Sequence, residues 1–180
     1  MFLSNIINSE ESEMRKNTLL YSAIFFLIIF LISFTASVAA AQTAYITCDD
    51  GNVYLINNLN QPATPLHIGN DPYGITVTSD GSKVYVTDYK ANNVYGIDTA
   101  TNTVSSPVKV GSTPIGIAVT PDGAKVYVAN SASNSVSVID TTKKPYSVTA
   151  TVQVGTTPYG VAVTPDGKNI YVSNSSFKDR

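Results

Sequence analysis

A phrase of 18 residues is repeated three times in this chain of 180 residues. It reads TPIGIAVTPDGAKVYVAN at positions 113–130, and close copies occupy 71–88 and 157–174. The equivalent prolines of successive copies are separated by 42 and then by 44 residues. Repetition at such a period constrains the fold strongly, because each repeat is one unit that buries its faces only against its neighbours.

Each repeat is predicted to contain four short strands. Residues 116–120 are mostly apolar, as expected of an inner strand that is covered on both faces. Thr-Pro-Asp-Gly at 120–123 predicts a tight turn, and 125–130 return as the second strand. Residues 135–140 alternate as a half-exposed third strand does, and 149–155 form an outer fourth strand. Four strands in a period of about 40–45 residues indicate the blades of a β-propeller.

The composition of the repeat region favours an all-β body. From Ala44 onward the chain contains no Glu, Trp or Met, and β-branched residues are abundant. After position 41 the chain contains ten Asp, eight Lys and one Arg, and no basic run is present. The electrostatic signature of a nucleic-acid-binding surface is therefore missing from the sequence.

The repeats resemble the YVTN-type β-propeller repeat of surface-layer and secreted proteins of archaea and bacteria. The motif stands at Tyr85–Asp88, Tyr127–Asn130 and Tyr171–Asn174, and the pattern VGxxPxGIAVTPDG precedes it at 110–123 and 154–167. This resemblance implies a seven-bladed propeller of four-stranded antiparallel blades, of which about three are present here. It does not imply one particular chemistry.

The repeat alignment predicts how the propeller is divided. We expect a partial propeller over 42–180, and its blades are given by their approximate ranges: 44–69 (partial), 70–111, 112–155 and 156–180 (partial). Three blades in an arc leave open faces and strand edges. A fragment of a longer propeller or a truncated reading frame is therefore expected, with closure by several associated chains as the alternative.

The segment before the repeats is predicted to direct export. Residues 1–13 form a polar tail, which a start at Met14 would leave out. Residues 14–41 combine a basic beginning, an apolar run and an Ala-Ala-Ala exit, which is typical of the hydrophobic helix of a signal peptide. The alternative is an uncleaved membrane anchor over 19–41. Both interpretations place the propeller at the cell surface or outside the cell.

Candidate chemical groups are few. His67, the only histidine, stands at a variable outer-strand position and is interpreted as a surface residue. Cys48 has no second cysteine in the chain to pair with. The stretch Asp-Asp-Gly-Asn at 49–52 resembles part of a calcium loop, but these are also ordinary hairpin residues. We expect no catalytic, cofactor-binding or metal-binding residue, and Asn174 begins a glycosylation sequon.

These observations predict a cell-surface or envelope propeller that is a structural or binding module and not an enzyme. Its expected partners are a protein or glycan at the cell surface, or other copies through open blade edges, with membrane contact only if 19–41 is uncleaved. The alternative is a fragment of a propeller enzyme, lactonase-like or quinoprotein-like, whose site lies on missing blades. Function is expected in what differs between copies, chiefly the hairpins at 89–93, 131–134 and 141–147.

Overall fold

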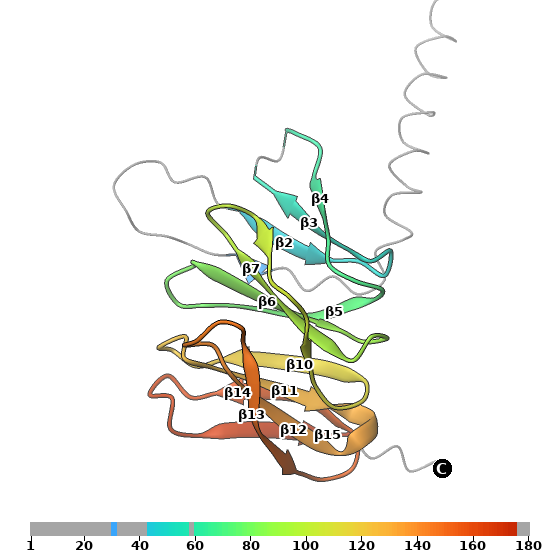
Figure 1. Cartoon of the computed structure of the whole chain (residues 1–180), viewed down its shortest axis with the longest axis vertical. Coiled ribbons are helices and arrows are strands. Elements are labelled where there is room, and N and C mark those ends of the chain that lie inside the picture. Colours follow the sequence, from blue (N-terminus) through green and yellow to red (C-terminus); the bar gives the residue numbers. More distant parts are fainter. Residues whose placement is uncertain (1–29, 32–42, 58–59, 176–180) are drawn as a thin grey trace, which may run out of the picture.

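A computed structural model describes residues 30–31, 43–57 and 60–175. These residues form four antiparallel sheets that follow one another along the chain. The first sheet lies at the top of Figure 1, the second below it, and the third and last overlap at its foot. Each of the first three sheets contains at least four strands, and the last contains two. The predicted fold class, an all-β partial propeller of about three antiparallel blades, is confirmed. The predicted signal helix falls largely outside the described residues.

The strands follow the repeat units closely. The first sheet contains β1 (Phe30–Leu31), β2 (Ala44–Thr47), β3 (Asn52–Ile56) and β4 (Thr64–His67). The second contains β5 (Pro72–Val77), β6 (Lys83–Asp88) and β7 (Asn93–Asp98), with an outer strand divided into β8 (Thr103–Val104) and β9 (Val108–Lys109). The third contains β10 (Pro114–Val119), β11 (Lys125–Asn130), the short 3₁₀ helix η1 (Ser131–Ser133), β12 (Ser135–Asp140) and β13 (Ser147–Gln153). The last contains β14 (Pro158–Val163) and β15 (Ile170–Asn174).

Strand β1 is a feature that the repeat alignment does not contain. Its backbone pairs antiparallel with β2, with Phe30 opposite Tyr45 and Leu31 opposite Ala44. It therefore occupies the inner position of the first sheet, although it belongs to the segment predicted to be a signal peptide. Cleavage after Ala41 would remove this strand from the sheet. Export itself stays a prediction.

The turn between the first two strands of each repeat has the predicted geometry. Gly81, Gly123 and Gly167 have φ values of 69°, 71° and 71°, which a residue with a Cβ adopts only with strain. The N–H of each glycine donates to the carbonyl of the threonine three residues earlier, at 2.8–2.9 Å. Local sequence is therefore sufficient to reverse the chain at these points.

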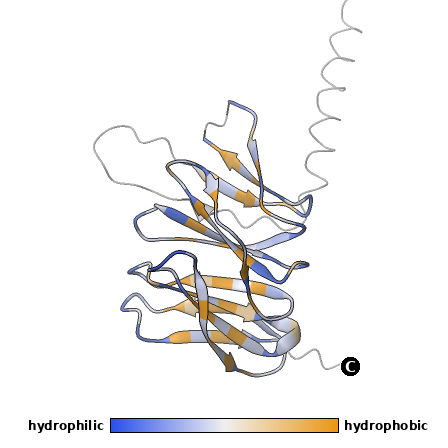
Figure 2. Cartoon of the chain, in the orientation of Figure 1, coloured by the Kyte–Doolittle hydropathy of each residue, from blue (hydrophilic) through white to orange (hydrophobic). Residues whose placement is uncertain are grey.

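Side chains of the second strand of a sheet alternate between two cores, because successive residues of a strand point to opposite faces. Val84 and Val86 of β6 pack toward the first sheet, whereas Tyr85 packs toward the third. Figure 2 shows the apolar residues concentrated in the strands and the polar residues in the connecting turns. The first core contains Tyr45, Val53, Leu55, Ile68, Ile75, Val84, Val86 and Ile97. The second contains Tyr85, Val94, Val108, Ile117, Val126, Val128 and Ile139.

Strand β12 differs from its prediction, since it is mostly buried and not half exposed. Its polar residues Ser135 and Ser137 are each only 1% exposed. Both accept hydrogen bonds from the Asn130 side-chain amide, at 3.1 and 2.9 Å. A polar position in an alternating pattern can therefore face the interior when a buried partner satisfies its hydroxyl.

Neighbouring sheets meet through a close approach of backbone to backbone. A Cβ on Gly74 of β5 would lie 2.0 Å from the carbonyl O of Ile115 in the next sheet. The same atom on Gly116 of β10 would lie 2.2 Å from the carbonyl O of Tyr159. In the second sheet Thr87 Oγ1 also donates to the Ile115 carbonyl, at 3.2 Å. Glycine at this position is thus a requirement of the packing between sheets.

Candidate functional site

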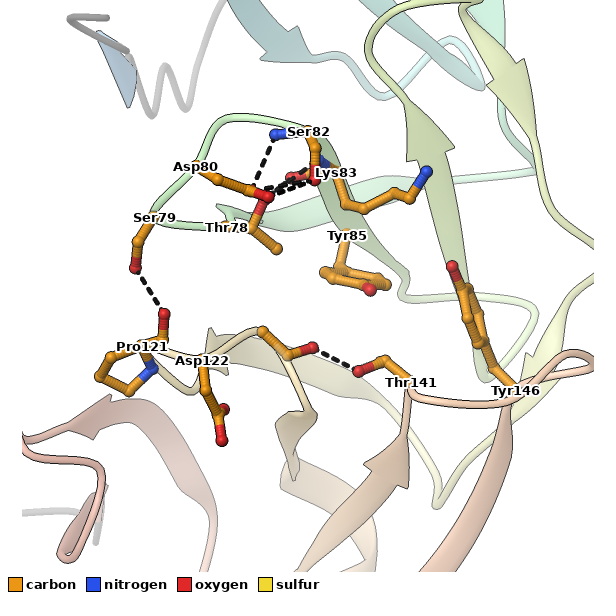
Figure 3. A pocket seen from close by; sticks show the side chains of 11 residues that line it. Thr78, Ser79, Asp80, Ser82, Lys83, Tyr85, Pro121, Asp122, Thr141 and Tyr146 are labelled. Atoms are coloured by element: carbon orange, nitrogen blue, oxygen red, sulfur yellow. Dashed lines mark hydrogen bonds between the residues drawn. The ribbon is translucent and has the colours of Figure 1, made fainter. Parts of the chain in front are cut away.

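A cleft of about 290 Å³ lies between the second and third sheets (Figure 3). It is bounded by the turns 78–82 and 121–123 and by the side chains of Lys83, Tyr85 and Tyr146. Ser79 Oγ donates to the carbonyl O of Pro121 at 3.0 Å and joins the two turns. The cleft is therefore formed by the contact between two neighbouring repeats.

The acidic residues of this cleft hold the turns together. Asp80 Oδ1 accepts from the Thr78 hydroxyl at 2.6 Å and from the Ser82 backbone N–H at 3.0 Å. Equivalent bonds form at Asp122 and Asp166. The threonine hydroxyl hydrogen bond is the main reason that the pKa of each of these carboxyl groups lies below its ordinary value. A carboxylate engaged in the same way in every repeat has a structural task.

The outer wall of the cleft comes from the insertion at 141–147. Its Tyr146 ring meets the Tyr85 ring edge-on, with centroids 5.9 Å apart and planes at 63°. The Thr141 hydroxyl donates to the Gly123 carbonyl, which holds the start of the insertion against the turn. Burial raises the pKa of the Tyr85 phenol. The insertion thus packs against the preceding sheet, and the hydroxyl of Thr141 is engaged by a carbonyl of the same protein.

Lys83 and Asp98 form an ion pair across the β6–β7 ladder, where the two residues stand directly opposite each other. Asp98 Oδ1 also accepts from the Thr101 backbone N–H at 3.2 Å and from its hydroxyl at 3.1 Å. The hydrogen bond from the Lys83 ammonium, followed by the bonds from Thr101, lowers the pKa of Asp98 to about 2.

This lowered pKa predicts a loss of stability in acid. A carboxyl group whose folded pKa lies below its unfolded pKa of about 4 stabilises the fold above pH 4, and that contribution is lost as the pH falls toward 2. We expect Asp98→Asn to flatten the decline of the melting temperature between pH 4 and 2, measured by circular dichroism. The decline should remain in Asp49→Asn, which changes an exposed turn residue. Equal slopes in Asp98→Asn and the unmodified chain would contradict the prediction.

A cluster of tyrosines lies where the inner strands of three consecutive sheets, β5, β10 and β14, run side by side. The residue before the inner-strand glycine is Tyr73 in β5, Ile115 in β10 and Tyr159 in β14. The Tyr73 and Tyr159 hydroxyls meet at 2.9 Å, although 86 residues separate them in sequence. Ile115, of the intervening strand, is buried. The two phenols therefore meet across the strand that separates their own.

Tyr89 adds a third ring to this axis cluster, which we define as Tyr73, Tyr89 and Tyr159. The Tyr73 and Tyr89 ring centroids are 5.8 Å apart, while Tyr89 and Tyr159 are 36% and 45% exposed. Burial, followed by the hydrogen bond with Tyr159, raises the pKa of Tyr73 to about 12. Inner strands surround the central channel of a propeller, so three tyrosines with partly exposed rings lie beside that axis.

The hairpin at 89–93, where function is expected, contributes Tyr89 to the axis cluster, but sequence reasoning missed Tyr73 and Tyr159. The available signal was the difference between copies at one position, which is Tyr, Ile and Tyr in successive repeats. Two of the hairpins in which function is expected also have a shared structural role. Asn92 Oδ1 accepts from the Thr113 N–H at 2.7 Å, and Asn134 Oδ1 accepts from the Thr157 N–H at 2.8 Å. Each asparagine links its hairpin to the start of the next repeat.

The other residues that the sequence analysis considered as candidate sites belong neither to the cleft nor to the axis cluster. His67 is exposed at the end of β4, as its interpretation as a surface residue requires. Asp50 accepts from the Asn52 N–H at 3.0 Å, which is a turn contact. Cys48 is half-buried, and burial raises the pKa of its thiol. Asn174 is exposed at the end of β15, and its glycosylation stays a prediction.

Within residues 30–31, 43–57 and 60–175, no three His, Cys, Asp or Glu side chains gather as a metal site would require. The same part of the chain contains no helix of the length and hydropathy needed to cross a membrane.

The stacked four-stranded sheets define a β-propeller-type fold, and solved structures of similar shape support this class. Hydrazine synthase from Kuenenia stuttgartiensis is 27% identical with a TM-score of 0.69, over 76% of this chain and 40% of that one. A candidate 6-phosphogluconolactonase from Bacteroides uniformis is 15% identical with a TM-score of 0.63, over 79% of this chain and 50% of that one. The chain thus spans at most half the length of these structures.

No family model matches the sequence, and a search of curated proteins finds no match.

The prediction of a non-catalytic surface module is contradicted by these comparisons. Hydrazine synthase, which is 27% identical over 76% of this chain, is an enzyme, and this favours the alternative of a propeller enzyme. The repeated phrase does not distinguish an enzyme from a binding module. It encodes strands, turns and contacts between sheets, and these are the same whatever chemistry a propeller carries.

Proposed function

We propose that this chain forms part of an enzyme-type β-propeller, with its described blades as the scaffold of the site. The observation that carries the proposal is the likeness to hydrazine synthase, which extends over 76% of the chain at 27% identity. The described residues contribute neighbouring blades and one side of the axis. The reacting groups would come from residues outside the described ranges, as in the alternative of a lactonase-like or quinoprotein-like fragment.

The axis cluster is the part of this scaffold that would border the substrate. Ligand sites are concave, with aromatic walls and a few polar groups that orient the ligand. The cluster supplies aromatic rings, and the Tyr73 and Tyr159 hydroxyls could orient a polar ligand. The cleft between the second and third sheets is a weaker candidate, because its turn carboxylates and Thr141 are engaged in structural hydrogen bonds.

The finer assignment, that these blades belong to the YVTN type, is part of the same proposal. It is supported by the order and spacing of Tyr85–Asp88, Tyr127–Asn130 and Tyr171–Asn174. Export through residues 14–41 is compatible with it and would be tested by the mass of the mature chain. A mature protein that retains residues 19–41 would contradict cleavage.

The proposal is tested by binding at the axis cluster. The full chain, with isotope-labelled tyrosine rings, would be titrated separately with hydrazine and with 6-phosphogluconate, two compounds related to the named activities of the similar structures. We expect one of them to shift the signals of the axis cluster and to leave Tyr127 unchanged. Tyr73→Phe and Tyr159→Phe should each weaken that binding by about tenfold at most, the effect of one hydrogen bond.

The response to each compound distinguishes the two kinds of enzyme. Shifts with hydrazine alone would favour chemistry related to that of hydrazine synthase, and shifts with 6-phosphogluconate alone would favour a lactonase. No shift at the axis cluster with either compound, or unaltered binding in both phenylalanine variants, would overturn the proposal.

A further inference from the structure

The cleft between the second and third sheets is built from parts that differ between repeats. Its Tyr146 belongs to the insertion at 141–147, which makes this repeat two residues longer than the one before it. A Cβ on Gly96 would lie 3.0 Å from the Tyr146 ring and 3.3 Å from the Tyr85 ring. The residue equivalent to Gly96 in the third sheet is Val138. The second sheet therefore has glycine where the ring from the insertion is seated.

This aromatic wall is formed by contacts within the protein itself. The Tyr85 and Tyr146 rings meet edge-on, and the bond from the Thr141 hydroxyl to the Gly123 carbonyl holds the start of the insertion. Tyr85 is 2% exposed, whereas Tyr146 is half-buried and presents part of its surface to the cleft. Small-molecule sites commonly have such preformed aromatic walls, because a fixed side chain loses little freedom on binding.

Polar groups at both ends of the cleft retain capacity for hydrogen bonds. Figure 3 shows Lys83, Tyr85 and Tyr146 at one end and the turns that carry Asp80 and Pro121 at the other. Because burial raises the pKa of the Tyr85 phenol, this hydroxyl stays protonated and can both donate and accept. Asp80 Oδ2 accepts one hydrogen bond, from the Ser82 hydroxyl at 2.9 Å, and a carboxylate oxygen can accept two.

The charges of the cleft favour a neutral ligand. The Lys83 ammonium is paired with Asp98, and the Asp80 carboxylate is ionised at neutral pH because the hydrogen bond from Thr78 lowers its pKa. An anion would face Asp80, and a cation would face Lys83. A ligand with several hydroxyl groups suits this mixture, since each hydroxyl both donates and accepts. The volume of about 290 Å³ lies near the lower limit for ligand pockets and suits a single sugar ring.

We propose that this cleft binds a neutral monosaccharide, with an apolar face of the sugar ring against Tyr146 and its hydroxyl groups hydrogen-bonded to Lys83 and Asp80. The site is separate from the axis cluster. It lies at the turns that follow the inner strands, whereas Tyr73 and Tyr159 stand near the starts of β5 and β14. The proposal is therefore independent of the proposed enzymatic function, and either can fail without the other.

The test follows the ring signals of isotope-labelled tyrosine in the full chain during separate titrations with D-glucose, D-galactose and D-mannose. We expect at least one of these sugars to shift the signals of Tyr85 and Tyr146 and to leave those of Tyr73 and Tyr159 unchanged. Cyclohexanol has a six-membered ring but a single hydroxyl group. It should bind at least about tenfold more weakly, because most of the hydrogen bonds of the sugar are lost.

Variants within the insertion provide a matched comparison. Tyr146→Ala removes the aromatic wall and should weaken sugar binding by about tenfold or more. Tyr146→Phe keeps the ring and should retain most of the affinity. Lys143→Ala changes an exposed residue of the same insertion that does not line the cleft, so it should bind as the unmodified chain does. Circular dichroism would check that each variant is folded.

Four results would overturn the proposal: no shift at Tyr85 and Tyr146 with any of the three sugars, shifts confined to the axis cluster, equal affinity for cyclohexanol, or unaltered binding in a folded Tyr146→Ala variant. A parallel titration with tetramethylammonium tests the charge argument. Shifts at Tyr85 and Tyr146 with this cation and none with the sugars would make an organic cation the ligand and would also overturn the proposal.

Discussion

Gly74→Ala should lower the free energy of unfolding by about 3 kcal/mol, the upper end of the usual cost of overpacking a core. The new Cβ would lie 2.0 Å from the Ile115 carbonyl O, so two backbone segments must separate. Separation would disturb the contact between the second and third sheets, which also includes the hydrogen bond from Thr87 to the same carbonyl. Urea unfolding followed by circular dichroism measures the loss.

Gly160→Ala is the matched control for this prediction. It changes the same position of the repeat, but its Cβ would meet only the Ser173 hydroxyl oxygen at 2.9 Å. A single exposed side chain can move, so we expect a loss of less than about 1 kcal/mol. Similar losses in the two variants would mean that glycine is required within each sheet and not by the contact between sheets.

Asp88→Ala is expected to cost about 3 kcal/mol, because it leaves three partly buried backbone donors without their acceptor. The Asp88 carboxylate is fully buried and accepts from the N–H groups of Asn70 at 2.8 Å, Asp71 at 3.2 Å and Ala91 at 3.0 Å. It thereby joins the end of β6 to the connection that enters the sheet and to the following hairpin. The loss would be measured by the same urea unfolding.

Two further variants separate this role from a general effect of the position. Asp88→Asn keeps one accepting oxygen and should lose roughly half as much as Asp88→Ala. Asn174→Ala changes the equivalent residue of the last sheet, which is exposed, and should be nearly neutral. A large loss in Asn174→Ala, or none in Asp88→Ala, would contradict the assignment of a buried structural carboxylate.

Much of the fold could be predicted because its determinants are local. The Thr-x-Asp-Gly turn is closed by hydrogen bonds within six residues, as at Thr78, Asp80 and Ser82. The position of the second strand follows from that turn, since a tight turn sets the register of the two strands that it joins. Repetition then extends the result from one unit to the others without further information.

The candidate sites depend on distances that a repeat pattern does not contain. Tyr73 and Tyr159 belong to different sheets, and their contact follows from the stacking of three inner strands. Tyr146 lies in an irregular insertion, whose path against Tyr85 is decided by packing and not by periodicity. The equivalent positions Asp88 and Asn130 are both buried yet have different partners: Asp88 accepts from backbone N–H groups, whereas the Asn130 amide donates to serine hydroxyls of β12.

The sequence by itself therefore determined the repeat unit, its turns and the propeller class, because turn hydrogen bonds and the alternation of side chains act over a few residues. Only the tertiary structure decided which side chains from different repeats meet, including the axis cluster, and which glycines receive a neighbouring carbonyl. It also shows that, among the described residues, β15 pairs only with β14. Those relations depend on how the sheets stack in space.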